Sequence, residues 1–309
     1  MKKVLIVLII TLLFLTACSN SKTSSDIPTY KAPKDSSVKL DIMTTDKLLY
    51  TIVKTIVKDK HRVNYMFKNR ESEINFKFTY DSLNNISRED LFIYVGAGFE
   101  PWIDSFTQKL DKNKVGIINS SRGAKLLSYD KPLKYGNITV NQNPYYFMNL
   151  DNYKVILVNI KNAVEDKDPQ NRSFYEKNFS DELKKIQDYE KDINDINENL
   201  KEYNFITLNE NLAYFTNYNR LKLMNINSSM GNILPVDPVD RKSLQDKLDS
   251  STVLLYTNDS ELKSNYDVIK NSHIKTAKIH MFDGRETYED TIKYNMESLR
   301  KVYEPKNNN

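Results

Sequence analysis

Few side chains in this sequence of 309 residues could carry out metal or nucleophilic chemistry. The chain has one cysteine, Cys18, and three histidines, His61, His273 and His280. This supply excludes disulfide frameworks, thiolate zinc modules and zinc proteases with the HExxH motif. No GxSxG elbow occurs, and no histidine has a catalytic neighbour in sequence, so we expect a protein that is not an enzyme.

None of the three histidines is expected to bind a ligand. His61 lies in a charged turn, Lys58 to Arg62, ahead of a predicted strand, where we expect it to be solvated. His273 precedes a later strand and is expected to be exposed. His280 alternates away from Asp283 along that strand, so the two side chains are poorly placed to share one ligand.

Composition describes a globular chain of one or two domains, with 28% charged and 39% hydrophobic residues. Lys2 and Lys3 supply two of the four net positive charges, so the remainder is nearly neutral and no nucleic-acid partner is expected. Only 7 glycines occur and no GxxxxGK[ST] is present, which excludes that class of phosphate-binding loop.

The N-terminus has the pattern of a secretion signal. Lys2 and Lys3 precede an apolar run, Val4 to Ala17, that as a helix would reach about 21 Å, short of a hydrocarbon core of roughly 30 Å. Residues 1–17 therefore read as a signal peptide. Its end, Leu15-Thr16-Ala17-Cys18, resembles the lipobox of bacterial lipoproteins, in which Cys18 would be acylated. The alternative is a plain secretory peptide that contains a cysteine.

The resemblance to a lipobox implies a location outside the cytoplasm, with a lipid anchor in the bacterial cell membrane. Residues 18–37 would then be the lipidated cysteine and a flexible tether, because Ser19 to Ser37 is polar and rich in Ser, Lys and Thr.

Downstream, short β-branched runs alternate with amphipathic stretches, a pattern that predicts an α/β fold with mostly parallel sheets. The predicted strands are Leu40–Met43, Val63–Phe67, Asp90–Val95, Val115–Asn119, Phe205–Leu208, Thr252–Tyr256 and Ala277–Phe282. The predicted helices are Leu48–Lys58, Trp102–Leu110, Val155–Val164, Asn211–Tyr218, Arg241–Leu248 and Tyr288–Val302.

One long helix interrupts this alternation. Asp168 and Pro169 form a start signal, and apolar residues then recur at helical spacing as far as Leu200. About 32 residues would span roughly 48 Å. The stripe could be a coiled-coil seam, but its position favours a rigid connector. We therefore expect a lobe at 38–167, a connecting helix at 168–201, a second lobe at 202–304 and a tail at 305–309.

The segment Asp90 to Trp102 reads DLFIYVGAGFEPW. Gly96 and Gly98 permit a tight turn from strand to helix, and Pro101 suits a first helical turn. The segment resembles the strand, GxGxEPW turn and helix of substrate-binding lipoproteins of zinc and manganese ABC importers. Further segments are similar to the same family: Asn119–Leu127, Glu165–Asn178, Phe205–Thr207, Ala213–Phe215 and Tyr294–Leu299.

This resemblance implies two α/β lobes joined by a long helix, with zinc or manganese held in the cleft between them. It also implies an ABC permease in the membrane as partner. In the family two metal-binding histidines come from the first lobe. The first falls at Ile74 or Asn75, with Ile74 favoured, and the second falls at Tyr145.

The family's remaining two metal ligands, a histidine or glutamate and an aspartate, come from the second lobe. The third position falls at Asn209, one residue before Glu210, and the fourth at Asp283. Only Asp283 matches. A neutral amide is a poor zinc ligand, and Tyr145 would have to lose a proton whose ordinary pKa is about 10.

We therefore expect a solute-binding lipoprotein whose site is altered and need not contain metal. Tyr145, Tyr146 and Phe147 could stack on a small polar or aromatic ligand or cap a cation, or they could simply fill space. An ordinary ion pair with Arg285 would also account for Asp283. The alternative function is a surface interaction or adhesion module that keeps the scaffold without transport.

Overall fold

The computed structural model describes residues 38–207, 209–224, 242 and 246–304. From Lys39 onward the chain forms one compact unit. The predicted signal peptide, Cys18, the tether, half of the predicted helix Arg241–Leu248 and the tail lie outside the described residues. Among the described residues, no helix combines the length and the apolar character that a membrane crossing requires.

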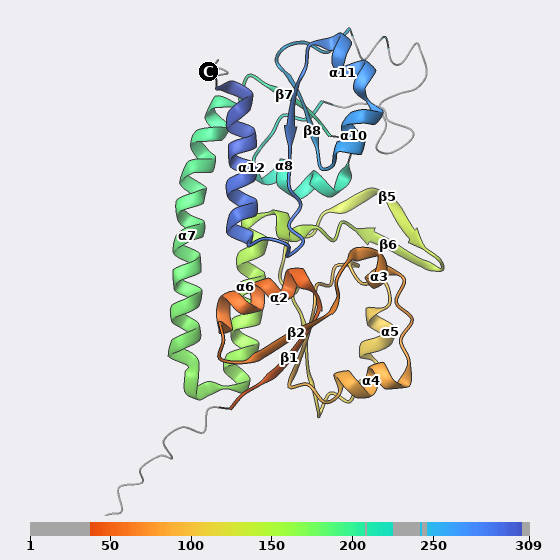
Figure 1. Ribbon diagram of the computed structural model, residues 1–309, viewed down its shortest axis with the longest axis vertical. Coiled ribbons are helices and arrows are strands. Elements are labelled where there is room, and N and C mark those ends of the chain that lie inside the picture. The colour runs from red at the N-terminus through yellow and green to blue at the C-terminus, as the bar shows by residue number, and fades with distance from the viewer. Residues whose placement is uncertain (1–37, 208, 225–241, 243–245, 305–309) are drawn as a thin grey trace, which may run out of the picture. The chain divides into compact units, whose positions relative to one another are not determined.

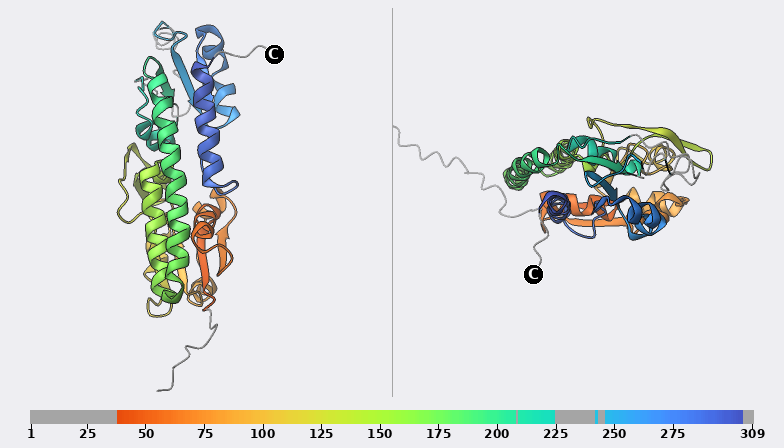
Figure 2. Two further views of the ribbon diagram at one scale, coloured as in Figure 1. Left: turned by 90° about the vertical axis from the view of Figure 1, so that its left-hand side faces the viewer. Right: turned by 90° about the horizontal axis from the view of Figure 1, so that it is seen from above.

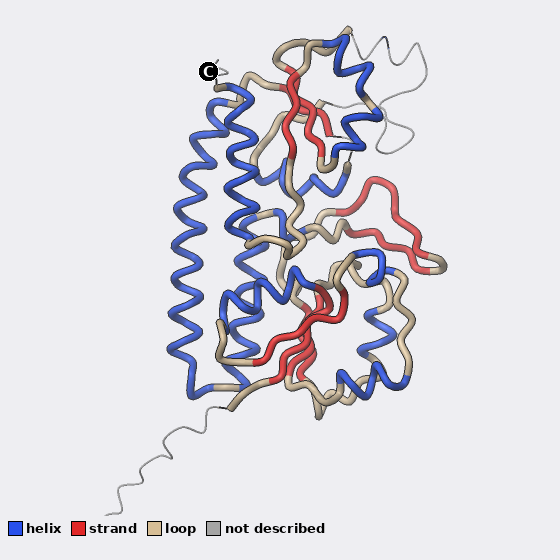
Figure 3. Tube along the Cα trace, viewed as in Figure 1, coloured by secondary structure: helices blue, strands red, loops and turns tan. Residues whose placement is uncertain are grey.

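The first lobe is built on a fully parallel sheet, as predicted (Figures 1 and 3). Its strand order is β2-β1-β3-β4, and the strands are β1 (Asp41–Asp46), β2 (Arg62–Phe67), β3 (Leu91–Tyr94) and β4 (Gly116–Asn119). The helices between them are α2 (Lys47–Val57), α3 (Arg70–Ile74), α4 (Tyr80–Ile86) and α5 (Ile103–Thr107).

Helix α2 shows how local sequence sets an element. Asp46 ends β1 and caps the helix, because its side chain accepts a hydrogen bond from the backbone N–H of Leu49. Apolar residues at helical spacing then bury one face, which consists of Leu48, Leu49, Ile52, Val53, Ile56 and Val57. The helix ends where Lys58 takes a positive φ of 49°.

An antiparallel hairpin follows the first sheet, and the sequence did not predict it. It pairs β5 (Ser128–Tyr135) with β6 (Ile138–Gln142) around a turn at Gly136, whose φ is +60°. Most hairpin side chains are exposed, so the strands lack the apolar alternation that marks a half-buried strand. After the hairpin come the 3₁₀ turn η1 (Tyr146–Met148) and α6 (Leu150–Lys167).

The long connecting helix is present, but it begins later than predicted. The backbone N–H of Asp168 donates to Val164 and ends α6, and Pro169–Asn171 (η2) forms a 3₁₀ turn before α7 (Arg172–Asn199) begins. Helix α7 packs on α2 and α6 of the first lobe and on α12 of the second. Figure 2 shows it beside α6 and then beside α12. Contact with both lobes favours the connector over the coiled-coil seam.

The second lobe holds a smaller parallel sheet of order β7-β8-β9. Its strands are β7 (Asn204–Thr207), β8 (Thr252–Tyr256) and β9 (Lys275–Lys278), and its helical elements are η3 (Glu210–Leu212), α8 (Ala213–Tyr218), α10 (Asp259–Ser264), α11 (Tyr266–Ser272) and α12 (Tyr288–Tyr303). Strand β9 ends before the predicted Phe282. The chain from Ile279 to Thr287 instead forms a loop that reaches the first lobe, where Phe282 packs on Phe147.

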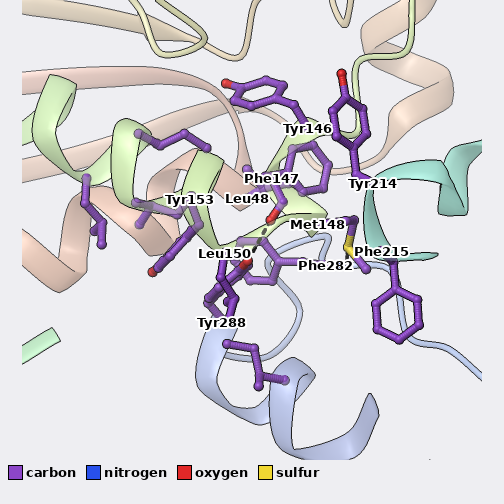
Figure 4. Close-up of a cluster of buried hydrophobic side chains, with 14 of the residues drawn as sticks. Leu48, Tyr146, Phe147, Met148, Leu150, Tyr153, Tyr214, Phe215, Phe282 and Tyr288 are labelled. Carbon is purple, nitrogen blue, oxygen red and sulfur yellow. Dashed lines mark hydrogen bonds between the residues drawn. The ribbon is translucent and has the colours of Figure 1, made fainter. Parts of the chain in front are cut away.

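The two lobes share one apolar core. Figure 4 shows its aromatic centre, where Tyr288 of α12 donates a 2.7 Å hydrogen bond from its hydroxyl to the carbonyl of Phe147. Tyr288 also stacks on Tyr153 of α6, with ring centroids 3.5 Å apart. The second lobe is therefore packed against the first at Phe147 and Tyr153.

His61 is buried, with 3% of its surface exposed, so the expectation of a solvated side chain was wrong. Its Nδ1 accepts from the Leu40 N–H at 3.3 Å, and its Nε2 lies 2.6 Å from the hydroxyl of Tyr175. That hydroxyl donates to Asp168. The charged neighbours suggested an exposed turn, but the imidazole turns inward because α7 supplies a partner 114 residues away. His273 is exposed, as predicted.

Candidate ligand-binding cleft

A cleft of about 480 Å³ lies between the two lobes. The first lobe contributes the β1–α2 junction, the β2–α3 segment, Phe99 and the start of η1, and the second lobe contributes loops after β7, β8 and β9. The lining residues include Asp46, Lys47, Phe67, Lys68, Asn69, Arg70, Glu73, Phe99, Tyr145, Phe147, Asn209, Asn211, Thr257, Met281, Phe282, Asp283 and Arg285. Segments far apart in sequence thus meet at the carboxyl ends of both sheets, where ligands of α/β folds usually bind.

Three of the predicted site residues, Tyr145, Asn209 and Asp283, line this cleft together. Ile74 and Asn75 are not among its lining residues, and the exposed side chain of Asn75 donates to the carbonyl of Glu71.

Glu210 also lies outside the lining of the cleft. Its carboxylate accepts from the Asp130 N–H at 3.2 Å, and its carbonyl accepts from the Asn143 side chain at 2.7 Å. Glu210 therefore joins the second lobe to the hairpin and to the segment ahead of η1.

Sequence reasoning did not single out Arg70, which lines the cleft at the first position of α3. Its Nη1 donates to Glu73 at 2.8 Å, and its Cζ lies 3.7 Å from the ring centroid of Phe99. The signal that could have found it is its position three residues after strand β2, at the carboxyl edge of the sheet. A fixed cation therefore lies inside the cleft.

Burial raises the pKa of two acidic groups near Arg70. Burial, with Asp46 and Glu100 nearby, raises the pKa of Glu73, and only 1% of Glu73 is exposed. Within the described structure its Oε1 has no hydrogen-bond partner. Burial also raises the pKa of Asp46, and Glu100 adds to this shift. A raised pKa reduces the negative charge that Glu73 and Asp46 can offer to a metal ion.

The GxGxEPW segment positions this edge of the cleft through its glutamate. The carboxylate of Glu100 accepts from the backbone N–H groups of Val95 at 2.7 Å and Gly96 at 2.9 Å, and from the Thr45 hydroxyl at 2.6 Å. It stabilises a turn in which Gly96, Ala97 and Gly98 all have positive φ. Glu100 is buried at the back of the turn, where it acts as an internal anion for backbone donors.

The donor atoms predicted for a metal are already engaged. Asp283 accepts from the Nε of Arg285 at 2.6 Å and from its backbone N–H at 3.0 Å. The amide oxygen of Asn209 caps η3 by accepting from the Asn211 N–H at 2.9 Å. Burial raises the pKa of Tyr145 above its ordinary value, which opposes the deprotonation that zinc would need.

The three predicted side chains that line the cleft, Tyr145, Asn209 and Asp283, supply a single carboxylate. Across the described ranges, no group of three or more His, Cys, Asp or Glu side chains is placed to hold a metal ion. Zinc needs three or four nitrogen, sulfur or carboxylate ligands at about 2.0–2.3 Å. Two parallel α/β lobes, one connecting helix and a cleft between the lobes define the architecture, and a cleft of this size is within the range of small-molecule sites.

The family follows from comparison with known proteins. The model of the zinc-uptake complex component A periplasmic family matches residues 42–302, so the chain belongs to this family. The resemblance and the α/β fold with a long connecting helix are both confirmed.

Two curated relatives illustrate the range of the family. The high-affinity zinc uptake system protein ZnuA of Bacillus subtilis is 26% identical over 217 residues, which is 68% of this chain and 66% of the relative. The manganese ABC transporter substrate-binding lipoprotein PsaA of Streptococcus pneumoniae is 28% identical over 194 residues, 60% of this chain and 58% of the relative. The matched part thus spans less than two thirds of either relative. Neither is named as an enzyme, in agreement with our expectation.

A crystal structure shows the same fold. The metal-dependent lipoprotein YcdH from Bacillus subtilis superposes with a TM-score of 0.71 at 21% identity, covering 85% of this chain and 98% of that one.

Proposed function

We propose that this chain is the extracytoplasmic, substrate-binding lipoprotein of an ABC importer of the zinc and manganese type, with an altered site that does not require metal. The observation that carries the proposal is the meeting of Tyr145, Asn209 and Asp283 in one interlobe cleft. Family membership supports the transport role. The chemistry of those three side chains supports the change of ligand.

The mechanism is capture in the cleft followed by presentation to a membrane permease. Ligand that contacts both lobes stabilises one arrangement of them over others, and this differential affinity is sufficient to signal loading. The shared core at Tyr288 and Phe147 limits how far the lobes can separate without losing buried contacts. We therefore expect small movements of the loops around the cleft.

The lipid anchor is proposed at Cys18. Support comes from the sequence Leu15-Thr16-Ala17-Cys18 and from relatives that are named as lipoproteins. Radiolabelled palmitate should label the wild-type protein in growing cells and should leave Cys18→Ser unlabelled. Equal labelling of both proteins would contradict the anchor.

Metal titration tests the altered site. The wild-type protein and Asp283→Ala, both freed of metal, would each be titrated with Zn²⁺ and with Mn²⁺. Thermal shift and calorimetry are the readouts. We expect no tight stoichiometric binding to either protein, because Asp283 is the only matched ligand and is held by Arg285. Tight binding that Asp283→Ala abolishes would establish a retained metal site.

Solute uptake tests the transport role. Cells that lack this protein should take up less of its solute than wild-type cells, and the wild-type gene should restore uptake. Unchanged uptake of every solute that the purified protein binds would favour the alternative, a surface interaction module without transport.

A further inference from the structure

The described side chains that line the interlobe cleft carry more basic than acidic groups. Four are basic, and they come from both lobes: Lys47, Lys68, Arg70 and Arg285. Three are acidic: Asp46, Glu73 and Asp283. Each fixed positive charge repels a free divalent cation, so this balance does not favour one.

When these charges are paired, the unpaired positive charges lie on the first lobe. Asp283 pairs with Arg285, and Glu73 pairs with Arg70. In the part of the chain that the structure describes, neither Lys47 nor Lys68 forms an ion pair. Asp46 is the acid that remains, and its carboxylate caps α2 by accepting a 2.9 Å hydrogen bond from the backbone N–H of Leu49.

Arg70 is held in a manner suited to recognition. Its guanidinium lies over the ring of Phe99 at 3.7 Å and donates one 2.8 Å hydrogen bond to Glu73. About a quarter of the side chain, 26%, remains exposed. A guanidinium has five N–H donors in a planar fork, so donors remain for a carboxylate in the cleft.

Aromatic rings supply an apolar wall beside this cation. Tyr145 lies edge-on to both Phe99 and Phe147, with ring centroids 5.9 Å apart in each pair. Phe282 of the second lobe continues the row at 6.4 Å from Phe147. An apolar wall with a few convergent polar groups is the usual form of an organic-ligand site, and about 480 Å³ lies within the usual range of roughly 300–1,000 Å³.

We propose that Arg70, together with Lys47 and Lys68, makes the cleft a site for a carboxylate-bearing organic solute in place of a free metal ion. The carboxylate pairs with the guanidinium fork of Arg70, and the two lysines add positive potential to the cleft. The carbon skeleton lies against Tyr145, which is less buried than Phe99 and Phe147. The proposal rests on the proposed role as a substrate-binding protein. The anion could arrive free or already chelating a metal, since both forms present a carboxylate.

The test is a binding screen on the full-length protein in buffer stripped of metal by a chelating resin. The probes are succinate, citrate, single amino acids and dipeptides, each offered free and each preloaded with Zn²⁺ or Mn²⁺, beside the metals alone. We expect at least one carboxylate to raise the melting temperature and to bind in calorimetry, whereas the free metals do not. The free and preloaded arms separate the two sources of the anion.

Matched variants then assign the binding to this cleft. Arg70→Lys keeps the charge but loses the fork, and Lys47→Gln with Lys68→Gln removes charge at one half-buried and one exposed position. Each change should weaken carboxylate binding by about 10-fold. Lys191→Gln is the control, because Lys191 lies on α7 outside the lining of the cleft and is 77% exposed, and this variant should retain near wild-type affinity.

No response to any carboxylate, or tight binding of free Zn²⁺ or Mn²⁺ in its place, would overturn the proposal and leave the substrate-binding role standing. Binding that is unaffected by all three basic substitutions would also overturn it. Failure of the substrate-binding role looks different, because the carboxylate would bind with the expected sensitivity to Arg70→Lys while its uptake by cells lacking the protein stayed unchanged.

Discussion

Gly284 of the second lobe lies directly against Lys47 of the first. A Cβ placed on Gly284 would meet the backbone carbonyl of Lys47 well inside van der Waals contact and would approach the Leu48 nitrogen to 2.6 Å. Gly284 also has a φ of +76°, which side-chain-bearing residues rarely adopt. The hydroxyl of Thr51 lies 3.0 Å from the Lys47 carbonyl and 3.4 Å from the Gly284 carbonyl, so its one proton is positioned between the two segments.

Replacing Gly284 with alanine should push the loop that contains it away from Lys47 and Leu48. We expect Gly284→Ala to lower the free energy of unfolding by about 2 kcal/mol or more, because backbone strain adds to a clash with backbone atoms that cannot move aside. Urea denaturation followed by circular dichroism measures the loss. Gly136→Ala is the matched control, since its φ of +60° carries strain but nothing lies within 4 Å of the added Cβ. An equal loss in both variants would mean that the contact with Lys47 contributes nothing.

The hydroxyl of Tyr288 should contribute measurably to the shared core. Tyr288→Phe leaves the buried carbonyl of Phe147 without its 2.7 Å donor, so we expect a loss of about 1–3 kcal/mol in the free energy of unfolding. Tyr80→Phe serves as the control because Tyr80 is 77% exposed. The expectation fails if Tyr288→Phe unfolds at the same denaturant concentration as the control.

The indole of Trp102 should anchor α3, the helix that carries Arg70. Its Nε1 donates a 2.8 Å hydrogen bond to the carbonyl of Glu73, and its ring contacts Phe76 edge-on at 4.9 Å between centroids. Trp102→Phe keeps an aromatic ring but removes the donor. We expect about 1–3 kcal/mol of lost stability, measured by thermal denaturation, and weaker binding of the carboxylate that the wild type binds. Unchanged stability would show that α3 is positioned without this bond.

His61 should make the protein less stable in mild acid. Burial lowers the pKa of the imidazole, although Asp168 partly offsets this shift, so the folded state favours the neutral ring. The unfolded chain takes up a proton near pH 6.5. The contribution of His61 is therefore fully present above about pH 6.5 and is lost as the pH falls from there through the lower folded pKa.

A comparison of wild type with His61→Gln isolates this effect from other titrating groups. The stability difference between the two proteins should be largest at pH 7–8 and should shrink as the pH falls toward 5. Denaturation midpoints at several pH values provide the measurement. A difference that is constant with pH would show that His61 does not titrate differently in the folded state.

The strands of both parallel sheets were predictable because local sequence patterns report burial, whereas the short helices α3, α4, α10 and α11 were not predicted. The alternation of β-branched runs with amphipathic stretches predicted both parallel sheets, and Asp90–Val95 contains the observed strand Leu91–Tyr94. The β5–β6 hairpin escaped prediction because its exposed strands carry no such pattern. The start of α7 was predicted too early because Asp168 does not cap that helix. Its carboxylate instead accepts hydrogen bonds from the side chains of Tyr175 and Asn171.

The candidate site was likewise predictable only in part from the sequence. The resemblance of several sequence segments to a known family pointed to Tyr145, Asn209 and Asp283, and these three residues line one cleft. Only the tertiary structure brought Arg70 to Phe99, paired Asp283 with Arg285 and turned His61 inward. These outcomes depend on how α3, the loop after β9 and α7 pack against distant segments. Such packing depends on how whole helices and loops are buried against one another. The spacing of residues along the chain does not specify these contacts.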